Sequence, residues 1–276
     1  MKQAIELNPD GFSVKGCKII YAPQGQAGEY SKLATNPYRG CGHRCVYCYV
    51  PQAIHISREE FDRGAKERKV YRRVLRNDVR KYQSLGIREQ VLLSFTTDPY
   101  HPFDTSLTRE VLEILCEHGM AFCTLTKGGS RALRDLDLFR PERDAFSSSL
   151  TLLDDAATRK WEPGAALPGD RIKTLERFYE AGIYTWVSLE PVIDVEATLE
   201  IIRRTHSFVN LFKVGRLNYS KLAGRINWGE FTERVINLLE RLKAEHYIKR
   251  DLQPYLPRGY RNELYRPQRR ELPVLN

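Results

Sequence analysis

Short apolar runs alternate with longer helical patterns along most of the chain, and this alternation limits the possible folds more than any other feature. The apolar runs have the length and composition of strands and lie at 90–97, 121–126, 144–151, 185–189 and 210–214. Helical patterns lie at 58–85, 105–118, 131–139, 170–181, 195–205 and 228–245. This order predicts an α/β fold with a parallel sheet covered by helices.

The ends of the helical patterns support this interpretation. Gly119 and Gly182 each follow a predicted helix, where a left-handed residue commonly ends it. Asp194 precedes the helix at 195–205 as an N-cap. With 31–36 as a first strand, the pattern has six strand–helix units, which fit an open partial barrel or a flat doubly wound sheet. Both folds place the active site at the carboxyl ends of the strands.

The pattern divides the chain into three parts. Residues 1–30 are weakly periodic and form an N-terminal extension, with a short strand at 17–21. Residues 31–220 contain the strand–helix units. Residues 221–276 contain one helix followed by a tail rich in arginine and tyrosine.

Three of the six cysteines lie close together in a C-x3-C-x2-C pattern, as Cys41, Cys45 and Cys48. Such thiolates on a glycine-bearing loop can bind one metal centre. A four-iron cluster normally takes four cysteines, so three leave one iron open for the amino and carboxylate groups of S-adenosylmethionine. The alternatives are a structural zinc site, for which Cys17 is the best fourth ligand, and three unligated cysteines.

The residues around the triplet are Asn-Pro-Tyr-Arg-Gly-Cys at 36–41 and Cys-Val-Tyr-Cys-Tyr at 45–49. The triplet, with Tyr47 before its last cysteine, resembles the radical S-adenosylmethionine superfamily. The surrounding residues resemble its spore photoproduct lyase-like branch, which is also labelled DNA repair photolyase-like. The resemblance covers about residues 30–220 and implies a partial (β/α)6 TIM-type barrel.

This resemblance implies a 4Fe–4S cluster on Cys41, Cys45 and Cys48, with S-adenosylmethionine as the second cofactor. It also implies an external one-electron reductant. The expected enzyme cleaves the cofactor reductively to a 5′-deoxyadenosyl radical, which abstracts hydrogen from a nucleic-acid or nucleotide-like substrate in repair or modification. One alternative is a radical enzyme that modifies a peptide or a small molecule. The other is a non-catalytic, metal-stapled nucleic-acid-binding protein.

Polar residues at the ends of two predicted strands are candidates for binding the methionine part of the cofactor. Thr97 and Asp98 end the strand at 90–97, and the resemblance places them at the methionine amino group. Lys127 ends the strand at 121–126 and could pair with the methionine carboxylate. The alternatives are a turn begun by Asp98 and a lysine that faces solvent.

Three further candidates are assigned to cofactor binding. Ser149 lies on one face of the strand at 144–151 and best matches the family's equivalent serine. Glu190 ends the strand at 185–189 and could accept hydrogen bonds from ribose hydroxyls, or it could be an ordinary loop carboxylate. Tyr47 belongs to the cysteine motif itself.

One position departs from the family pattern. Spore photoproduct lyase has a cysteine just before its Thr-Ser-Asp segment, and that cysteine returns a hydrogen atom to the product radical. Phe95 occupies this position here. Cys116 in a predicted helix and Cys123 in a predicted strand are more typical of buried small apolar residues. The lyase's own reaction is therefore not what this sequence indicates.

The net charge of +9 comes from 44 basic and 35 acidic residues and permits a polyanionic partner. Basic residues gather at Arg58–Lys81, and arginines alternate with tyrosines in the C-terminal tail, at Tyr255, Arg258, Tyr260, Arg261, Tyr265, Arg266, Arg269 and Arg270. This pattern is typical of nucleic-acid surfaces, and the alternative is a solvated helix face with a tail packed on the domain. The sequence shows neither a membrane-spanning run nor a secretory signal, so we expect a cytoplasmic location.

Overall fold

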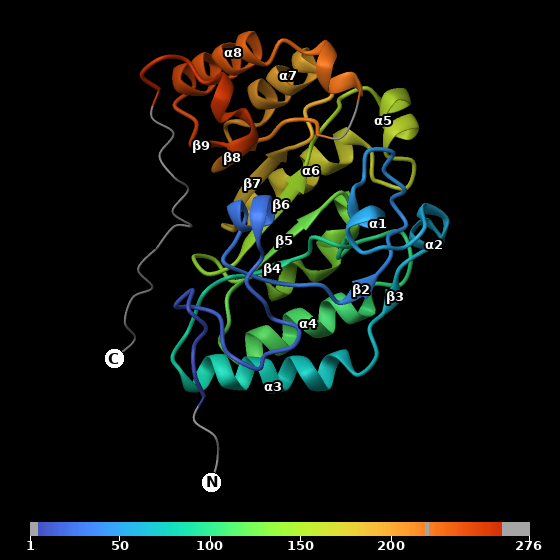
Figure 1. The fold of residues 1–276 in the computed structure, drawn as a ribbon, viewed down its shortest axis with the longest axis vertical. Coiled ribbons are helices and arrows are strands. Elements are labelled where there is room, and N and C mark those ends of the chain that lie inside the picture. The colour runs from blue at the N-terminus through green and yellow to red at the C-terminus, as the bar shows by residue number, and fades with distance from the viewer. Residues whose placement is uncertain (1–4, 219–220, 261–276) are drawn as a thin grey trace.

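The computed structural model describes residues 5–218 and 221–260. Its centre is a parallel sheet of seven strands in the order β1-β4-β5-β6-β7-β8-β9 (Figure 1). The strands are β1 (Leu33–Thr35), β4 (Val91–Leu93), β5 (Phe122–Thr126), β6 (Ala145–Ser149), β7 (Tyr184–Leu189), β8 (Leu211–Val214) and β9 (His246–Ile248). Their order in space follows their order in the chain, as in a barrel that remains open between its first and last strands. The predicted α/β partial barrel is confirmed.

Helices cover the outside of the sheet and follow its strand order, from α3 at one end to α8 at the other (Figure 1). Contacts join α3 to α4, α6 to both β6 and β7, and α7 to α8. The helices are α3 (Tyr71–Ser84), α4 (Ser106–Glu117), α6 (Pro168–Glu180), α7 (Val195–Thr205) and α8 (Trp228–Arg241), with the 3-10 helix η2 (Gly129–Leu138) after β5. The predicted caps are present, since Asp194 accepts a hydrogen bond from the amide of Ala197 and Gly182 has a φ of 78°.

The core lies on both faces of the sheet because successive side chains of a strand point to opposite sides. Toward the helices, the rings of Phe146 and Phe178 stack with their centroids 3.8 Å apart. Toward the inside of the barrel, a smaller cluster includes Leu92, Cys123 and Trp186. These inner side chains fill the lower part of the barrel.

The predicted helix at 58–85 is wrong in one respect, because the structure divides it. A short helix α2 (Arg58–Asp62) is followed by β3 (Lys66–Glu67) and only then by α3. β3 pairs with β2 (Tyr38–Arg39) in a two-stranded antiparallel sheet, and Gly64, with a φ of 139°, makes the turn into it. The short helices α1 (Val50–Ala53) and α5 (Asp155–Trp161) were not predicted.

Both ends of the chain differ from the expectation. The segment at 17–21 is not a strand: Tyr21 alone bridges to Ala34, and Oδ2 of Asp78 accepts hydrogen bonds from the amides of residues 18–20. Beyond residue 220 the chain still contributes β9 to the main sheet, together with η3 (Lys221–Arg225) and η4 (Arg250–Tyr255). Most of the arginine- and tyrosine-rich tail, 261–276, lies outside the described residues.

Candidate active site

A cavity of about 460 Å³ lies at the carboxyl ends of the strands. Every site residue predicted from the sequence lines it: Cys41, Cys45, Tyr47, Cys48, Thr97, Asp98, Lys127, Ser149 and Glu190. Several other residues of its wall were not selected from the sequence, among them Tyr30, His43, Ser188 and Lys249. The carboxyl ends of parallel strands meet at one edge of a sheet, which explains why residues so far apart in the chain converge.

The cysteine-bearing loop is fixed from several sides. The amide of Cys41 donates to the carbonyl of Phe61 at 3.1 Å, and the amide of Cys48 donates to the carbonyl of Cys45 at 3.0 Å. Gly42 and Gly164 lie so close that a Cβ at Gly164 would stand 2.1 Å from the carbonyl oxygen of Gly42. The backbone path of this loop therefore depends on contacts with residues more than a hundred positions away.

The arrangement of the cysteines fits a cluster better than a single ion. Within residues 5–218 and 221–260, no three His, Cys, Asp or Glu side chains gather closely enough to hold one metal ion. Thiolates around one zinc lie on the order of 4 Å apart, because each zinc–sulfur bond is about 2.3 Å long. Cys17 does not line the cavity. A 4Fe–4S cluster instead binds each thiolate through a separate iron.

Asp98 connects the cysteine loop to two strands. Its Oδ1 accepts from the amide of Tyr100 at 2.8 Å and from Oγ1 of Thr126 at 2.6 Å. Its Oδ2 accepts from the amide of Lys127 at 2.8 Å and lies 3.2 Å from Nδ1 of His43. Burial opposes the charged form, but His43 and these hydrogen bonds hold the pKa of Asp98 well below its usual range. Asp98 lines the cavity and also holds its wall together.

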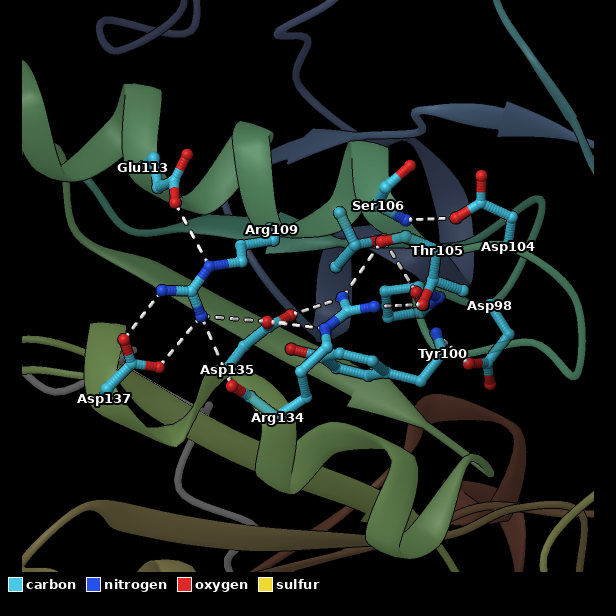
Figure 2. A network of polar contacts seen from close by, with 12 residues as sticks. Asp98, Tyr100, Asp104, Thr105, Ser106, Arg109, Glu113, Arg134, Asp135 and Asp137 are labelled. Carbon is cyan, nitrogen blue, oxygen red and sulfur yellow. Dashed lines mark hydrogen bonds and ion pairs between the residues drawn. The ribbon is translucent and has the colours of Figure 1, made fainter.

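Figure 2 shows the polar network that continues from Asp98 and Tyr100 into the outer helices. The carboxylate of Asp135 is fully buried and lies between two guanidinium groups, at 3.3 Å from Arg109 and 2.8 Å from Arg134. Arg134 also donates to Oγ1 of Thr105 at 3.0 Å. These bonds fix η2, which begins two residues after Lys127, against the N-terminal part of α4.

Lys127 reaches the cavity next to a buried ion pair. Its Nζ lies 5.7 Å from the centroid of the Tyr47 ring and makes no hydrogen bond within the described part of the chain. Burial disfavours its charge, yet Cys45 and Glu162 raise the pKa of Lys127. Glu162 accepts from the hydroxyl of Tyr47 and, at 2.5 Å, from the fully buried Arg171. Because Arg171 balances Glu162, the ammonium of Lys127 is available to an anion.

Thr97 and Ser149, two predicted site residues that carry a hydroxyl group, have different roles. Oγ1 of Thr97 donates to the carbonyl of Gly40 at 2.8 Å, which links the end of β4 to the cysteine loop. Ser149 offers its side chain to the cavity, while its carbonyl accepts from Arg171 at 3.0 Å. Ser149 is therefore better placed than Thr97 to bind a ligand through its hydroxyl.

Glu190 lines the cavity directly after the end of β7. Its Oε2 accepts a hydrogen bond from Nζ of Lys249 at 2.5 Å and another from the hydroxyl of Tyr30. The same hydroxyl lies 2.9 Å from Oγ of Ser188. Lys249 could not be found from the sequence because β9 was not predicted, and Tyr30 could not because the N-terminal extension has no periodic signal.

The end of β8 supplies a cation to the wall of the cavity. The guanidinium of Arg216 lies between two aromatic rings, with Cζ 5.3 Å from the centroid of Trp228 and 5.6 Å from that of Tyr255. Nε of Arg216 is buried and has no hydrogen-bond partner among the described residues. Asn218 lines the wall nearby and donates to Asp251 at 2.8 Å.

Phe95 also lines the cavity. The position where the resemblance would place a hydrogen-donating cysteine therefore faces the predicted cofactors with a side chain that has no transferable hydrogen. Cys123 is buried below, where it accepts a hydrogen bond from the indole of Trp186 at 3.2 Å, and neither it nor Cys116 lines the cavity. Both thiols pack against the core, as the sequence suggested.

The comparison with protein families identifies the chain. Residues 35–209 match the radical SAM superfamily, and the chain belongs to it. A 4Fe–4S cluster and S-adenosylmethionine are accordingly its cofactors, and it is a radical S-adenosylmethionine enzyme. It is 26% identical over 214 residues to uncharacterized protein ORF301 of Acidianus two-tailed virus, covering 69% of both chains. It is 28% identical over 193 residues to an uncharacterized protein of Methanocaldococcus jannaschii, covering 68% of this chain and 71% of that one.

Solved structures share the fold at low sequence identity. Spore photoproduct lyase complexed with dinucleoside spore photoproduct has a TM-score of 0.64 and 13% identity, covering 85% of this chain and 79% of that chain. Streptococcus suis SuiB bound to S-adenosylmethionine has a TM-score of 0.61 and 13% identity, covering 81% of this chain. The chain spans about half of SuiB, 52% of its length.

Proposed function

We propose that Cys41, Cys45 and Cys48 bind the 4Fe–4S cluster and that the other predicted residues of the wall bind S-adenosylmethionine. The observation that carries this proposal is that one cavity is lined by all of these residues, although they come from the cysteine loop and the ends of four strands. Lys127 would bind the methionine carboxylate, Thr97 and Asp98 would border its amino group, and Ser149 and Glu190 would contact ribose. Tyr47 would form the side of this pocket next to Lys127.

Bound there and reduced by an external one-electron reductant, the two cofactors would supply the radical chemistry that removes hydrogen from a substrate. The chain itself orients the bound groups and excludes water from them.

The test of this proposal is anaerobic reconstitution with iron and sulfide, followed by dithionite and S-adenosylmethionine. We expect a brown protein that releases 5′-deoxyadenosine. Cys41→Ala should abolish both the colour and the product, whereas Cys116→Ala, outside the cavity, should change neither. A Cys41→Ala protein with a full cluster would contradict the ligand assignment.

For the substrate, we propose a nucleic acid or a nucleotide-like molecule that presents a phosphate to Arg216. Arg216 lines the cavity with its guanidinium next to two aromatic rings, and a guanidinium suits an anion such as phosphate that accepts several hydrogen bonds. Lys249 also lines the cavity, but its charge is paired with Glu190, so Arg216 carries this proposal. The fold likeness to a lyase solved with a dinucleoside photoproduct is consistent with this substrate class.

The basic stretch Arg58–Lys81 supports this proposal less than its composition suggested. Arg72 is paired with Glu67 and Glu110, and Arg76 lies 2.5 Å from Glu117. Exposed cations such as Arg73 and Arg80 remain on α3, but no residue of α3 lines the cavity. The surface that contacts the substrate during the reaction would thus be the cavity wall at Arg216.

Fluorescence anisotropy with short single-stranded DNA and RNA oligonucleotides, at two salt concentrations, tests the substrate class. We expect salt-dependent binding that Arg216→Gln weakens and that Arg225→Gln, a charge-matched control in η3, leaves unchanged. Binding that is equal in both variants, or absent in the unsubstituted protein, would contradict a nucleotide substrate. Such a result would favour a peptide or small-molecule substrate.

A further inference from the structure

One arginine outside the cavity holds the loop that carries two of the three cysteines. Nη1 of Arg58 donates to the carbonyl of Cys45 at 3.0 Å, and Nη2 donates to the carbonyls of Val46 and Cys48 at 3.3 and 2.9 Å. A single guanidinium thus donates hydrogen bonds to the carbonyls of three residues in the segment 45–48. This segment belongs to none of the helices or strands, and two further backbone hydrogen bonds hold it, from the amide of Val46 to the carbonyl of Trp161 and from that of Cys48 to the carbonyl of Cys45.

Arg58 stands outside the wall of the cavity. Cys45 and Cys48 line the cavity, whereas Arg58 does not. It is the first residue of α2, and Ser57 caps that helix by accepting from the amide of Glu60 at 3.0 Å. The guanidinium therefore contacts the backbone of this loop from outside the cavity, and it can act on the cluster through the shape of the loop and through its charge.

The positive charge of Arg58 is only weakly compensated by an acidic side chain. Its ion partner Asp62 is 3.7 Å away, which is longer than a hydrogen bond, and 41% of the arginine side chain is exposed. Reduction adds a negative charge to a cluster that already carries thiolates. A fixed cation nearby stabilises the reduced form more than the oxidised form, and the reduction potential rises accordingly.

We propose that Arg58 is a positioning residue that holds the ligand loop in shape and raises the reduction potential of the 4Fe–4S cluster. This inference rests on the proposed ligation by Cys41, Cys45 and Cys48. Residues that orient metal ligands from behind commonly affect metal affinity strongly when they are replaced. Here the effect would pass through the backbone carbonyls of ligands rather than through their side chains.

Arg58→Lys and Arg58→Gln separate the two effects, with the exposed Arg63→Gln, at the end of the same helix, as control. After anaerobic reconstitution, two quantities are measured: the rate of iron loss to a chelator and the potential from an EPR-monitored redox titration. We expect Arg58→Gln to lose iron about tenfold faster and to have a more negative potential. Arg58→Lys keeps the charge but cannot reach three carbonyls, so it should lose iron faster at a nearly unchanged potential.

Iron loss and potential equal to those of Arg63→Gln in both Arg58 variants would overturn the inference. A potential unchanged in Arg58→Gln would overturn its electrostatic part. These results differ from a failure of the proposed function, in which the unsubstituted protein itself takes up no cluster. Far-UV circular dichroism of each metal-free variant checks that the fold is kept, as the partial exposure of Arg58 leads us to expect.

Discussion

Nζ of Lys249 lies 2.5 Å from Oε2 of Glu190, so that an ion pair joins the end of β9 to the end of β7 across the intervening β8. The side chain of Lys249 is 2% exposed and that of Glu190 is 18% exposed. The hydroxyl of Tyr30, from the N-terminal extension, donates to the same carboxylate. One carboxylate thereby connects the first and last parts of the open barrel at the wall of its cavity.

Removing the lysine of this pair should destabilise the fold. We expect Lys249→Met to lower the free energy of unfolding by about 3 kcal/mol, because the partly buried carboxylate of Glu190 loses its cation. The exposed Lys173→Met on α6 serves as control and should stay within about 0.5 kcal/mol of the unsubstituted protein. Urea unfolding followed by circular dichroism measures both. A Lys249→Met protein as stable as the control would show that the pair contributes nothing.

Replacing Lys127 should weaken cofactor binding with little effect on cluster content. The assigned role of its ammonium is to bind the methionine carboxylate, and a charge-assisted hydrogen bond contributes about 1.5–3 kcal/mol. We expect Lys127→Met to raise the Kd for S-adenosylmethionine by about tenfold or more, measured by equilibrium dialysis on the reconstituted protein. Lys160→Met, which alters an exposed lysine of α5, should leave the Kd unchanged. Equal affinities in the two variants would remove Lys127 from the binding site.

A methyl group at Gly164 should disturb the cysteine loop. The added Cβ would stand 2.1 Å from the carbonyl oxygen of Gly42, so the backbone must shift. We expect Gly164→Ala to cost about 1–3 kcal/mol of stability and to reduce the iron bound per chain after reconstitution. In the control Gly169→Ala, a Cβ meets no atom within 4 Å. Full iron content in Gly164→Ala would show that the loop tolerates the shift.

The buried Lys213 should make stability depend on pH. Burial lowers the pKa of its ammonium from 10.5 to about 7 in the folded protein. Between pH 7 and 10.5 the unfolded chain therefore binds more protons at this residue, and the free energy of unfolding rises with pH through this range. Below pH 7 the destabilisation is present in full. It amounts to a few kcal/mol, since each pKa unit corresponds to about 1.4 kcal/mol.

Lys213→Met removes the titrating group, and the difference between its stability and that of the unsubstituted protein isolates this residue from others that titrate. We expect the unfolding free energy of Lys213→Met to rise less between about pH 7 and pH 10, as measured by urea unfolding at several pH values. Parallel profiles for the two proteins would show that Lys213 keeps its ordinary pKa when folded.

The helices in the described part of the chain were compared with the requirements for a membrane span. None of its helices combines the length and the apolar character that crossing a bilayer requires.

The sequence by itself determined the class of fold and part of the cavity wall. Apolar runs and helical periods are local properties, and they predicted β4 to β8 and most of the covering helices. Cys41, Lys127 and Glu190 could be predicted to line one site because each ends a strand or belongs to a distinctive motif. The carboxyl ends of parallel strands converge whatever the detailed packing.

Only the tertiary structure decided which charged residues are used inside the fold. Arg58 and Arg72 looked alike in the basic stretch, yet Arg58 binds the cysteine loop and Arg72 pairs with Glu67 and Glu110. The seventh strand, and with it Lys249, also escaped prediction because β9 contains only two apolar residues, Tyr247 and Ile248, and charged residues follow it directly. A hydrogen bond or ion pair depends on where two distant segments meet. Local sequence does not contain that information.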